Sequence, residues 1–216
     1  MKTKKVFLIV SCVYPYAYEA DTKEIEKRIQ ETNDTISSIR KWCPDADVVL
    51  YDFGRCIPEI ETQECDLFMY EGGRWIYKYA ARGKGLGEAI ALRRLLKQVG
   101  AYHIYYKISG RYCLNSQFGK KETSEGFNFV VYKDGQLFLN ATQEYVRGAS
   151  YSTRLYAVHG KEYLVKWRRS LLLAIPLMIK GISIESAMPF FIKKPINYCE
   201  KVGVQGLVAG KEFIAE

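Results

Sequence analysis

The sequence is poor in histidine and lacks paired cysteines. Its 216 residues include two histidines, His103 and His159, and six cysteines that occur singly, without a Cys-x-x-Cys pair. A metal site built from more than two imidazoles is therefore excluded. Six scattered cysteines are also too few for a disulfide scaffold in a chain of this length, so a reduced, cytoplasmic compartment is the simplest expectation.

Long apolar runs are also missing. The apolar stretch 6–13 is short and lacks the small-residue cleavage site of a signal peptide. The stretch 171–179 is far too short to span a bilayer. The chain is therefore expected to be soluble. We favour a buried core helix with a basic start for the second stretch. The alternative is peripheral contact of Trp167, Arg168 and Arg169 with an anionic membrane, such as the inner face of a cell membrane.

Internal repeats and low-complexity linkers are absent, which favours a single domain over residues 1–216. A hydrophobic content of 48% allows a core of that size. The chain has 32 basic and 24 acidic residues, a formal net charge of +8. Such an excess favours anionic partners, namely nucleic acid, acidic lipid or phosphorylated small molecules, but it does not choose among them.

The first 52 residues predict a strand, a helix and a second strand. The continuous apolar run 6–13 is typical of a strand buried on both faces. An apolar stripe predicts a helix over 23–42 that is capped near Asp21 or Thr22, and 48–51 predicts the second strand. A right-handed parallel unit of this kind brings Ser11 and Asp52 to the same rim of the sheet.

The stretch 83–114 is the centre of the chain's organisation. Its glycine-rich start, GKGLGEA, is followed by apolar residues at three- and four-residue intervals up to a helix stop at Gly100. A strand over 102–108 then runs into a polar cluster, KISGRY. Ligands of open α/β sheets bind at the carboxyl rim, so we expect this cluster to belong to a binding site.

The rest of the chain predicts a mixed pattern. We expect a short helix at 64–70, a hairpin of 127–132 and 136–139 around Lys133-Asp134-Gly135, a strand at 150–159, helices at 162–178 and 183–192, and strand or loop from Cys199 onward. Together the elements predict an α/β fold.

The order of a first apolar strand, a helix with ETNDTISSIRK, PDADVVLYD and a KGLGEA helix resembles the nucleotide-sugar glycosyltransferases of the GT-A fold. KISGRY itself is similar to a stretch in poorly characterised polysaccharide-building transferases. The resemblance implies a Rossmann-like, mostly parallel central sheet flanked by helices. It also implies a nucleotide-binding half (1–115), an acceptor-side half (116–216), and transfer of a hexose or related sugar from a nucleotide-sugar donor to a glycan or lipid-linked acceptor.

The resemblance also implies positions for the donor. The nucleoside is expected beside Ser11 and Asp52. The diphosphate side is expected to involve Lys84, Glu88, Lys107, Ser109, Arg111 and Arg154. The family's metal-binding DxD falls at Ser109-Gly110-Arg111, where this chain has no carboxylate.

Two carboxylates normally hold a divalent cation that neutralises the leaving diphosphate. Arg111 and Lys107 can supply that positive charge instead, which predicts a metal-independent transferase. The alternatives are a surface ion pair for Arg111, a solvated strand end for Lys107, a solvent-facing Arg154, and Mg²⁺ or Mn²⁺ held by other residues.

A general base for the acceptor hydroxyl is also needed in an inverting enzyme. Glu185 is the first candidate and His159 the second; the alternative for Glu185 is a carboxylate that satisfies backbone N–H groups at a helix start. Asp134 is discounted because of its expected turn. Tyr112 and Asn115 are expected to contact the sugar by stacking and hydrogen bonding.

Two other classes of function compete. GKGLGEA allows a Rossmann-like enzyme that binds S-adenosylmethionine or a dinucleotide, although its loop lies mid-chain. The basic and aromatic segments GRYC and VKWRRS allow a nucleic-acid-binding protein, although no recognisable binding motif is present and nucleic acid is not the expected partner.

Overall fold

The computed structural model describes residues 3–16, 19–120, 123–132, 136–138, 145–147, 150–192, 196–199, 203–208 and 212–215. The main sheet has the strand order β11-β6-β10-β4-β1-β2-β3, and β9 pairs with β6. These strands are β1 (Lys5–Ser11), β2 (Asp47–Asp52), β3 (Leu67–Tyr70), β4 (Ile104–Ser109), β6 (Gly126–Tyr132), β9 (Ser150–Tyr151), β10 (Leu155–His159) and β11 (Ile196–Cys199). Strands β1 to β4 are mutually parallel, and β10 runs antiparallel to β4 and β6. The predicted mixed, mostly parallel sheet is therefore confirmed.

The predicted parallel unit at the start of the chain is also confirmed. Helix α1 (Thr22–Trp42) begins after Asp21, whose side chain accepts a hydrogen bond from the Glu24 N–H. This cap satisfies one of the free N–H groups at the helix start. The register of β1 on β2 pairs Ser11 with Asp52 at the carboxyl rim, as expected.

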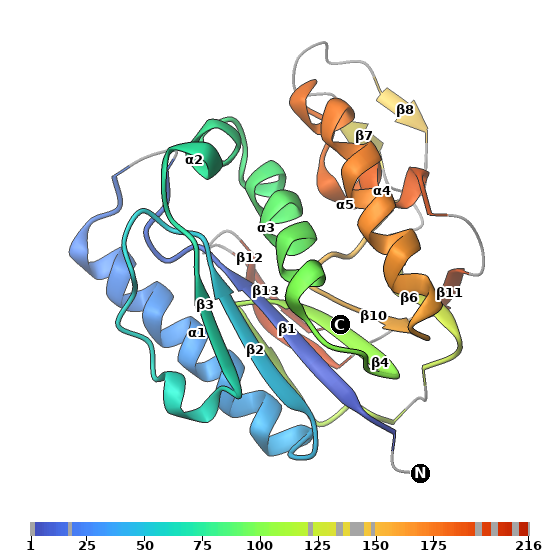
Figure 1. Cartoon of the computed structure of the whole chain (residues 1–216), viewed down its shortest axis with the longest axis horizontal. Helices are drawn as coiled ribbons and strands as arrows, with labels where there is room; N and C mark the ends of the chain where they lie inside the picture. Colours follow the sequence, from blue (N-terminus) through green and yellow to red (C-terminus); the bar gives the residue numbers. More distant parts are fainter. Residues whose placement is uncertain are drawn as a thin grey trace.

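Helices cover both faces of the sheet (Figure 1). Four helices pack on one face: α2 (Arg74–Ala80), α3 (Lys84–Gln98), α4 (Glu162–Ile179) and α5 (Ile184–Phe190). The other face packs against α1 and a small sheet of β5 (Tyr112–Leu114), β12 (Val204–Val208) and β13 (Glu212–Ala215). Alternate residues of β1 serve the two cores, since Leu8 and Val10 face α3 while Phe7 and Ile9 face α1.

Three sequence predictions differ from the structure. Residues 64–70, expected as a helix, form the end of a 3₁₀ turn (Thr62–Glu64) and the edge strand β3. The segment 150–159 is broken at 152–154 into β9 and β10. The expected hairpin partner of β6 is β7 (Gln136–Phe138), but within the described residues β7 pairs with β8 (Tyr145–Arg147). The Lys133-Asp134-Gly135 turn lies outside the described residues.

None of the helices in the described part of the chain is long and apolar enough to cross a membrane.

Candidate functional site

Two adjoining hollows lie at the carboxyl rim of β1 and β4. The larger hollow has a volume of about 420 Å³ and is bordered by the start of α3, the end of β4, residues 153–154 and the α4–α5 junction. The smaller hollow, under the loop that follows β1, has a volume of about 30 Å³, which is room for one or two water molecules. Both are lined by Lys84, Glu88, Ser109 and Arg111. The structure therefore brings four of the predicted donor-site residues together.

A buried lysine forms the wall between β4 and α3. Lys107 is fully buried, and its ammonium donates to Ser109 Oγ at 2.7 Å and to the Thr153 carbonyl at 2.6 Å. It also forms an ion pair with Glu88, whose side chain is 12% exposed. The ammonium is therefore engaged by three groups of the protein, two through hydrogen bonds and one through an ion pair. Strand β4 continues for two residues past Lys107, so this residue lies inside the wall and not at a solvated strand end.

The polar segment after β4 is held close to its neighbours. The Ser109 N–H donates to the Arg154 carbonyl at 3.0 Å, and the Gly110 N–H donates to the Val10 carbonyl at 3.2 Å. A Cβ at Gly110 would lie 3.0 Å from Ser11 Cβ, which is closer than ordinary packing allows. Glycine at 110 therefore permits β4 to approach β1, and the Arg111 side chain lines both hollows.

The start of α3 faces the larger hollow. Its first residues, with Arg82, Gly83 and the exposed Lys84, line that hollow. Gly83 caps the helix, and within the described residues no side chain accepts a hydrogen bond at this cap. Unpaired N–H groups and the helix dipole favour an anion at such a position. A Cβ at Gly85 would lie 3.3 Å from Ile184 Cγ2, so the α3 start also packs against α5.

The start of α5 carries the predicted base. Glu185 lies in the first turn of α5, and its Oε1 accepts a hydrogen bond from the Thr153 hydroxyl at 2.9 Å. Because the Thr153 carbonyl accepts from Lys107, hydrogen bonds and an ion pair connect Glu88 through Lys107 and Thr153 to Glu185. Arg154 and Tyr112 line the same hollow, with the guanidinium 5.8 Å from the ring centre.

Asp52 stabilises the loop after β1. Its fully buried carboxylate accepts hydrogen bonds from Ser11 Oγ at 2.7 Å, from the Val13 N–H at 3.0 Å and from the Gly54 N–H at 2.8 Å. Burial raises the pKa of Asp52 above its ordinary value, although the three hydrogen bonds act in the other direction. Ser11 lines the smaller hollow, whereas the Asp52 oxygens are engaged by the protein itself.

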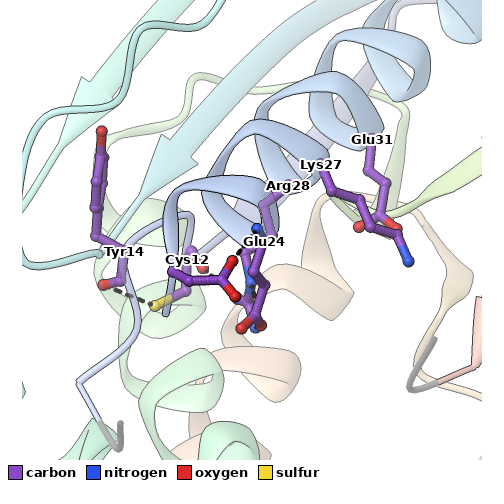
Figure 2. Close-up of polar contacts among 7 residues, drawn as sticks. Cys12, Tyr14, Glu24, Lys27, Arg28 and Glu31 are labelled. Carbon is purple, nitrogen blue, oxygen red and sulfur yellow. Dashed lines mark hydrogen bonds and ion pairs between the residues drawn. The ribbon is translucent and has the colours of Figure 1, made fainter. Parts of the chain in front are cut away.

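Arg28 holds the same loop from the side of α1 (Figure 2). Its guanidinium donates to the Cys12 carbonyl at 2.8 Å and forms an ion pair with Glu24 at 2.8 Å. Arg28 and Cys12 both line the smaller hollow. Burial, reinforced by the nearby Asp52, raises the pKa of the Cys12 thiol to about 12, so this cysteine is not a thiolate nucleophile near neutral pH.

Two predicted site residues lie elsewhere. His159 pairs in register with Ile104 at the opposite end of β4, because β10 runs antiparallel, and its Nδ1 lies 3.0 Å from the Thr123 carbonyl oxygen. Asn115 follows β5, where its N–H donates to the Gly203 carbonyl and its Oδ1 accepts from the Gln117 N–H. The structure does not bring either side chain to the hollows.

Sequence reasoning missed Arg28, Arg82 and Thr153 as lining or positioning residues. Arg28 lies beside the apolar stripe of α1, and its contact with Cys12 depends on how the helix docks on the sheet. The basic neighbour Arg82 could have been noticed, because it directly precedes the glycine-rich segment. No local pattern identifies Thr153, whose importance comes from Lys107 and Glu185.

The glycine-rich segment does not form a dinucleotide loop. GKGLGEA begins α3, and the element before it is helix α2. The Rossmann fingerprint needs a strand, a glycine-rich turn and then a helix. The structure therefore does not support the alternative of a dinucleotide or S-adenosylmethionine site at this loop.

The residues around the hollows do not fit a divalent cation. Among the described residues, no group of three or more His, Cys, Asp or Glu side chains could hold a metal ion. The carboxylates that line the hollows are Glu88, which is paired with Lys107, and Glu185, which is bonded to Thr153. The segment at the family's DxD position supplies Ser109, Gly110 and Arg111 instead of oxygen ligands.

No protein-family model matches the chain, and no curated protein matches it. Solved glycosyltransferase structures do match its fold. The galactosyltransferase LgtC in complex with donor and acceptor sugar analogues aligns at a TM-score of 0.52 and 8% identity, over 90% of this chain and 72% of LgtC. An active-site mutant of LgtC gives the same TM-score and coverage at 10% identity.

The bifunctional glycosyltransferase WbbM, in its apo form, aligns at a TM-score of 0.52 and 7% identity over 92% of this chain, which spans 39% of the WbbM chain. At these identities the likeness is one of fold. The chain therefore has the GT-A glycosyltransferase fold that its sequence predicts.

Proposed function

We propose that the protein is a glycosyltransferase that moves a sugar from a nucleoside diphosphate donor to a glycan or lipid-linked acceptor. The observation that carries the proposal is the larger hollow, which is lined together by cationic side chains, an exposed helix start and the Glu185 carboxylate. This arrangement suits a reaction in which an anion leaves and a hydroxyl loses its proton.

The diphosphate occupies the cationic wall in this proposal. Arg111 pairs with phosphate oxygens through its planar guanidinium, and Lys84 with the α3 N–H groups completes the anion site. Arg154, in the segment between β9 and β10, adds a further positive charge to this anion site. Negative charge develops on the diphosphate as the bond to the sugar carbon breaks, so fixed cations stabilise the transition state without a metal.

In this proposal the nucleoside lies against the rim at Ser11 and the loop held by Arg28 and Asp52, outside the smaller hollow, which is too small to enclose it. Asp52 acts as a positioning residue here because its carboxylate is engaged by the protein. Lys107 and Glu88 have a similar role on the other side. They fix Ser109 and Thr153, and Thr153 in turn orients Glu185.

Glu185 takes the proton of the acceptor hydroxyl in this proposal, and Tyr112 packs against the transferred sugar. His159 and Asn115 have no part in it. A nucleic-acid-binding role has less support, because the Glu185 carboxylate lies among the cationic side chains that line the hollow.

Donor cleavage tests the proposal. The protein is incubated in EDTA with UDP-, GDP- and CMP-linked sugars, and the released nucleotide is measured by chromatography. We expect slow cleavage of one nucleoside diphosphate sugar, reduced by Arg111→Ala. Cleavage that requires Mg²⁺ or Mn²⁺ would contradict metal independence while keeping the transferase. The absence of both donor cleavage and nucleotide binding would contradict the transferase itself.

A further inference from the structure

Helix α4 leaves one side apolar and open. Four large aliphatic side chains on it are exposed: Val165 by 68%, Leu172 by 45%, Leu173 by 40% and Ile179 by 47%. At 3.6 residues per turn these positions lie on one side of the helix, and the buried Trp167 and Leu171 lie on the other. The predicted packing of this helix in the core is therefore confirmed for the side with Trp167 and Leu171, whereas the other side is exposed.

Basic side chains surround the apolar residues. Between 161 and 180 the basic residues are Lys161, Lys166, Arg168, Arg169 and Lys180, and the single acidic residue is Glu162. Arg169 falls within the apolar side, and Lys166 lies at its border. Long basic side chains can lay their methylene groups along an apolar surface while the charge reaches a polar layer.

This composition matches a helix that lies in a membrane interface. Such helices bury an apolar side at the boundary of headgroups and acyl chains and place Lys and Arg among anionic headgroups. Exposed apolar patches on a soluble domain normally mark an interaction site. A second copy of the chain is a poor occupant, because pairing two α4 helices would bring their basic residues together.

The helix also leads directly to the larger hollow. Met178 lines that hollow, and Lys180 is followed by residues 181–185, which form its wall up to Glu185. Figure 1 shows α4 and α5 side by side on the same face of the sheet, beside α3. Met178 belongs to the buried side of α4, so a surface that contacts the exposed side would come near the hollow only at the C-terminal end of the helix, at Ile179 and Lys180.

We propose that the α4 face, comprising Val165, Lys166, Arg169, Leu172, Leu173 and Ile179, binds the surface of an anionic lipid bilayer without crossing it. This binding does not depend on the transferase activity. If the proposed function holds as well, the inference favours a lipid-linked acceptor, because the C-terminal end of α4 leads into the wall of the larger hollow.

Vesicle sedimentation tests this inference. The full chain is mixed with vesicles of phosphatidylcholine alone, or with vesicles of phosphatidylcholine that contain about 30% phosphatidylglycerol. We expect binding to the anionic vesicles that weakens with salt and little binding to the neutral ones. Two double variants test the face. The first, Leu172→Glu with Leu173→Glu, removes apolar contact, and the second, Lys166→Glu with Arg169→Glu, reverses basic charge. We expect each to lower the partition coefficient at least about tenfold. The control Ile57→Glu alters another exposed aliphatic residue and should leave binding unchanged.

Circular dichroism and melting temperature establish that each variant is folded, and sedimentation velocity measures self-association. Absent binding of the folded wild type to anionic vesicles would overturn the inference. So would equal loss in the Ile57→Glu control, or a wild-type dimer that the leucine variant dissociates without any vesicle binding. UDP and GDP binding by the leucine variant is measured in parallel, so failure of the membrane inference stays distinct from failure of the proposed transferase.

Discussion

Arg111 is the side chain on which the metal-free proposal depends most. Replacing it with alanine removes one charge-assisted contact with the diphosphate, worth roughly 1.5–3 kcal/mol, so we expect donor cleavage to fall about 10- to 100-fold. Arg111→Lys should recover part of the loss, since it keeps the charge but not the bidentate geometry. The control Arg74→Ala changes an exposed arginine at the start of α2. Equal cleavage by wild type and Arg111→Ala would contradict the assigned role.

The buried pair of Lys107 and Glu88 gives a second prediction. Lys107→Met leaves a nearly buried carboxylate unpaired, and such a change costs about 3–5 kcal/mol of unfolding free energy. Adding Glu88→Leu removes that carboxylate and should recover much of the loss. Urea unfolding of both single variants and the double variant measures the coupling. Additive losses in the double variant would show that the two side chains do not act as a pair.

Asp52 gives a prediction about pH. Its pKa is raised in the folded protein from an ordinary value of 3.8, so the folded state binds this proton more tightly than the unfolded state. The contribution of Asp52 to stability therefore falls as pH rises from about 3.8 through the raised folded value. We expect wild type to lose stability relative to Asp52→Asn over that window. If the stability of wild type relative to Asp52→Asn instead grows with pH, the three hydrogen bonds lower the pKa of Asp52 more than burial raises it, which would contradict the prediction.

Gly110 links the ends of β4 and β1. Gly110→Ala places a Cβ 3.0 Å from Ser11 Cβ, so the end of β4 must shift at a cost of about 1–3 kcal/mol. We expect weaker nucleotide binding and a lower melting temperature. Gly100→Ala is the matched control, because its Cβ meets its nearest neighbour, Tyr102, only at 4.0 Å. Unchanged nucleotide binding in Gly110→Ala would contradict a site at this rim.

The elements with strong periodicity could be predicted from the sequence. Strand β1, helix α1 with its Asp21 cap, helix α3 and strand β4 were all indicated by local patterns, and so was the meeting of Ser11 with Asp52. Short elements could not be predicted in this way. Four residues of β3 and seven of α2 are too few to establish a period, and tertiary pairing decides their conformation.

Part of the candidate site could also be predicted, because parallel strands end at the same rim of a sheet. Residues that end parallel strands or begin the following helix could be placed at one rim, which gives Ser11, Ser109, Arg111 and Lys84. Strand direction on the far side of the sheet could not be inferred, and the antiparallel β10 places His159 at the opposite end. The pairing of Lys107 with Glu88 joins a strand to a helix nineteen positions earlier, which no short pattern reveals.

The complete fold combines a site at the sheet rim with an open basic helix. The rim supplies the two hollows, and the junction of α4 and α5 adds Glu185 to the lining of the larger one. Fold likeness alone supports many activities, so the function depends on the residues that line the site.

Nucleotide-dependent thermal stabilisation tests the central claim most directly. The wild type is heated with UDP, GDP, CMP or S-adenosylmethionine, each with Mn²⁺ and with EDTA. A ligand that binds only the folded state raises the melting temperature. We predict stabilisation by one nucleoside diphosphate that persists in EDTA and is lost in Arg111→Ala. A shift that disappears in EDTA would contradict the metal-free site, and the absence of a shift with every nucleotide would contradict the glycosyltransferase.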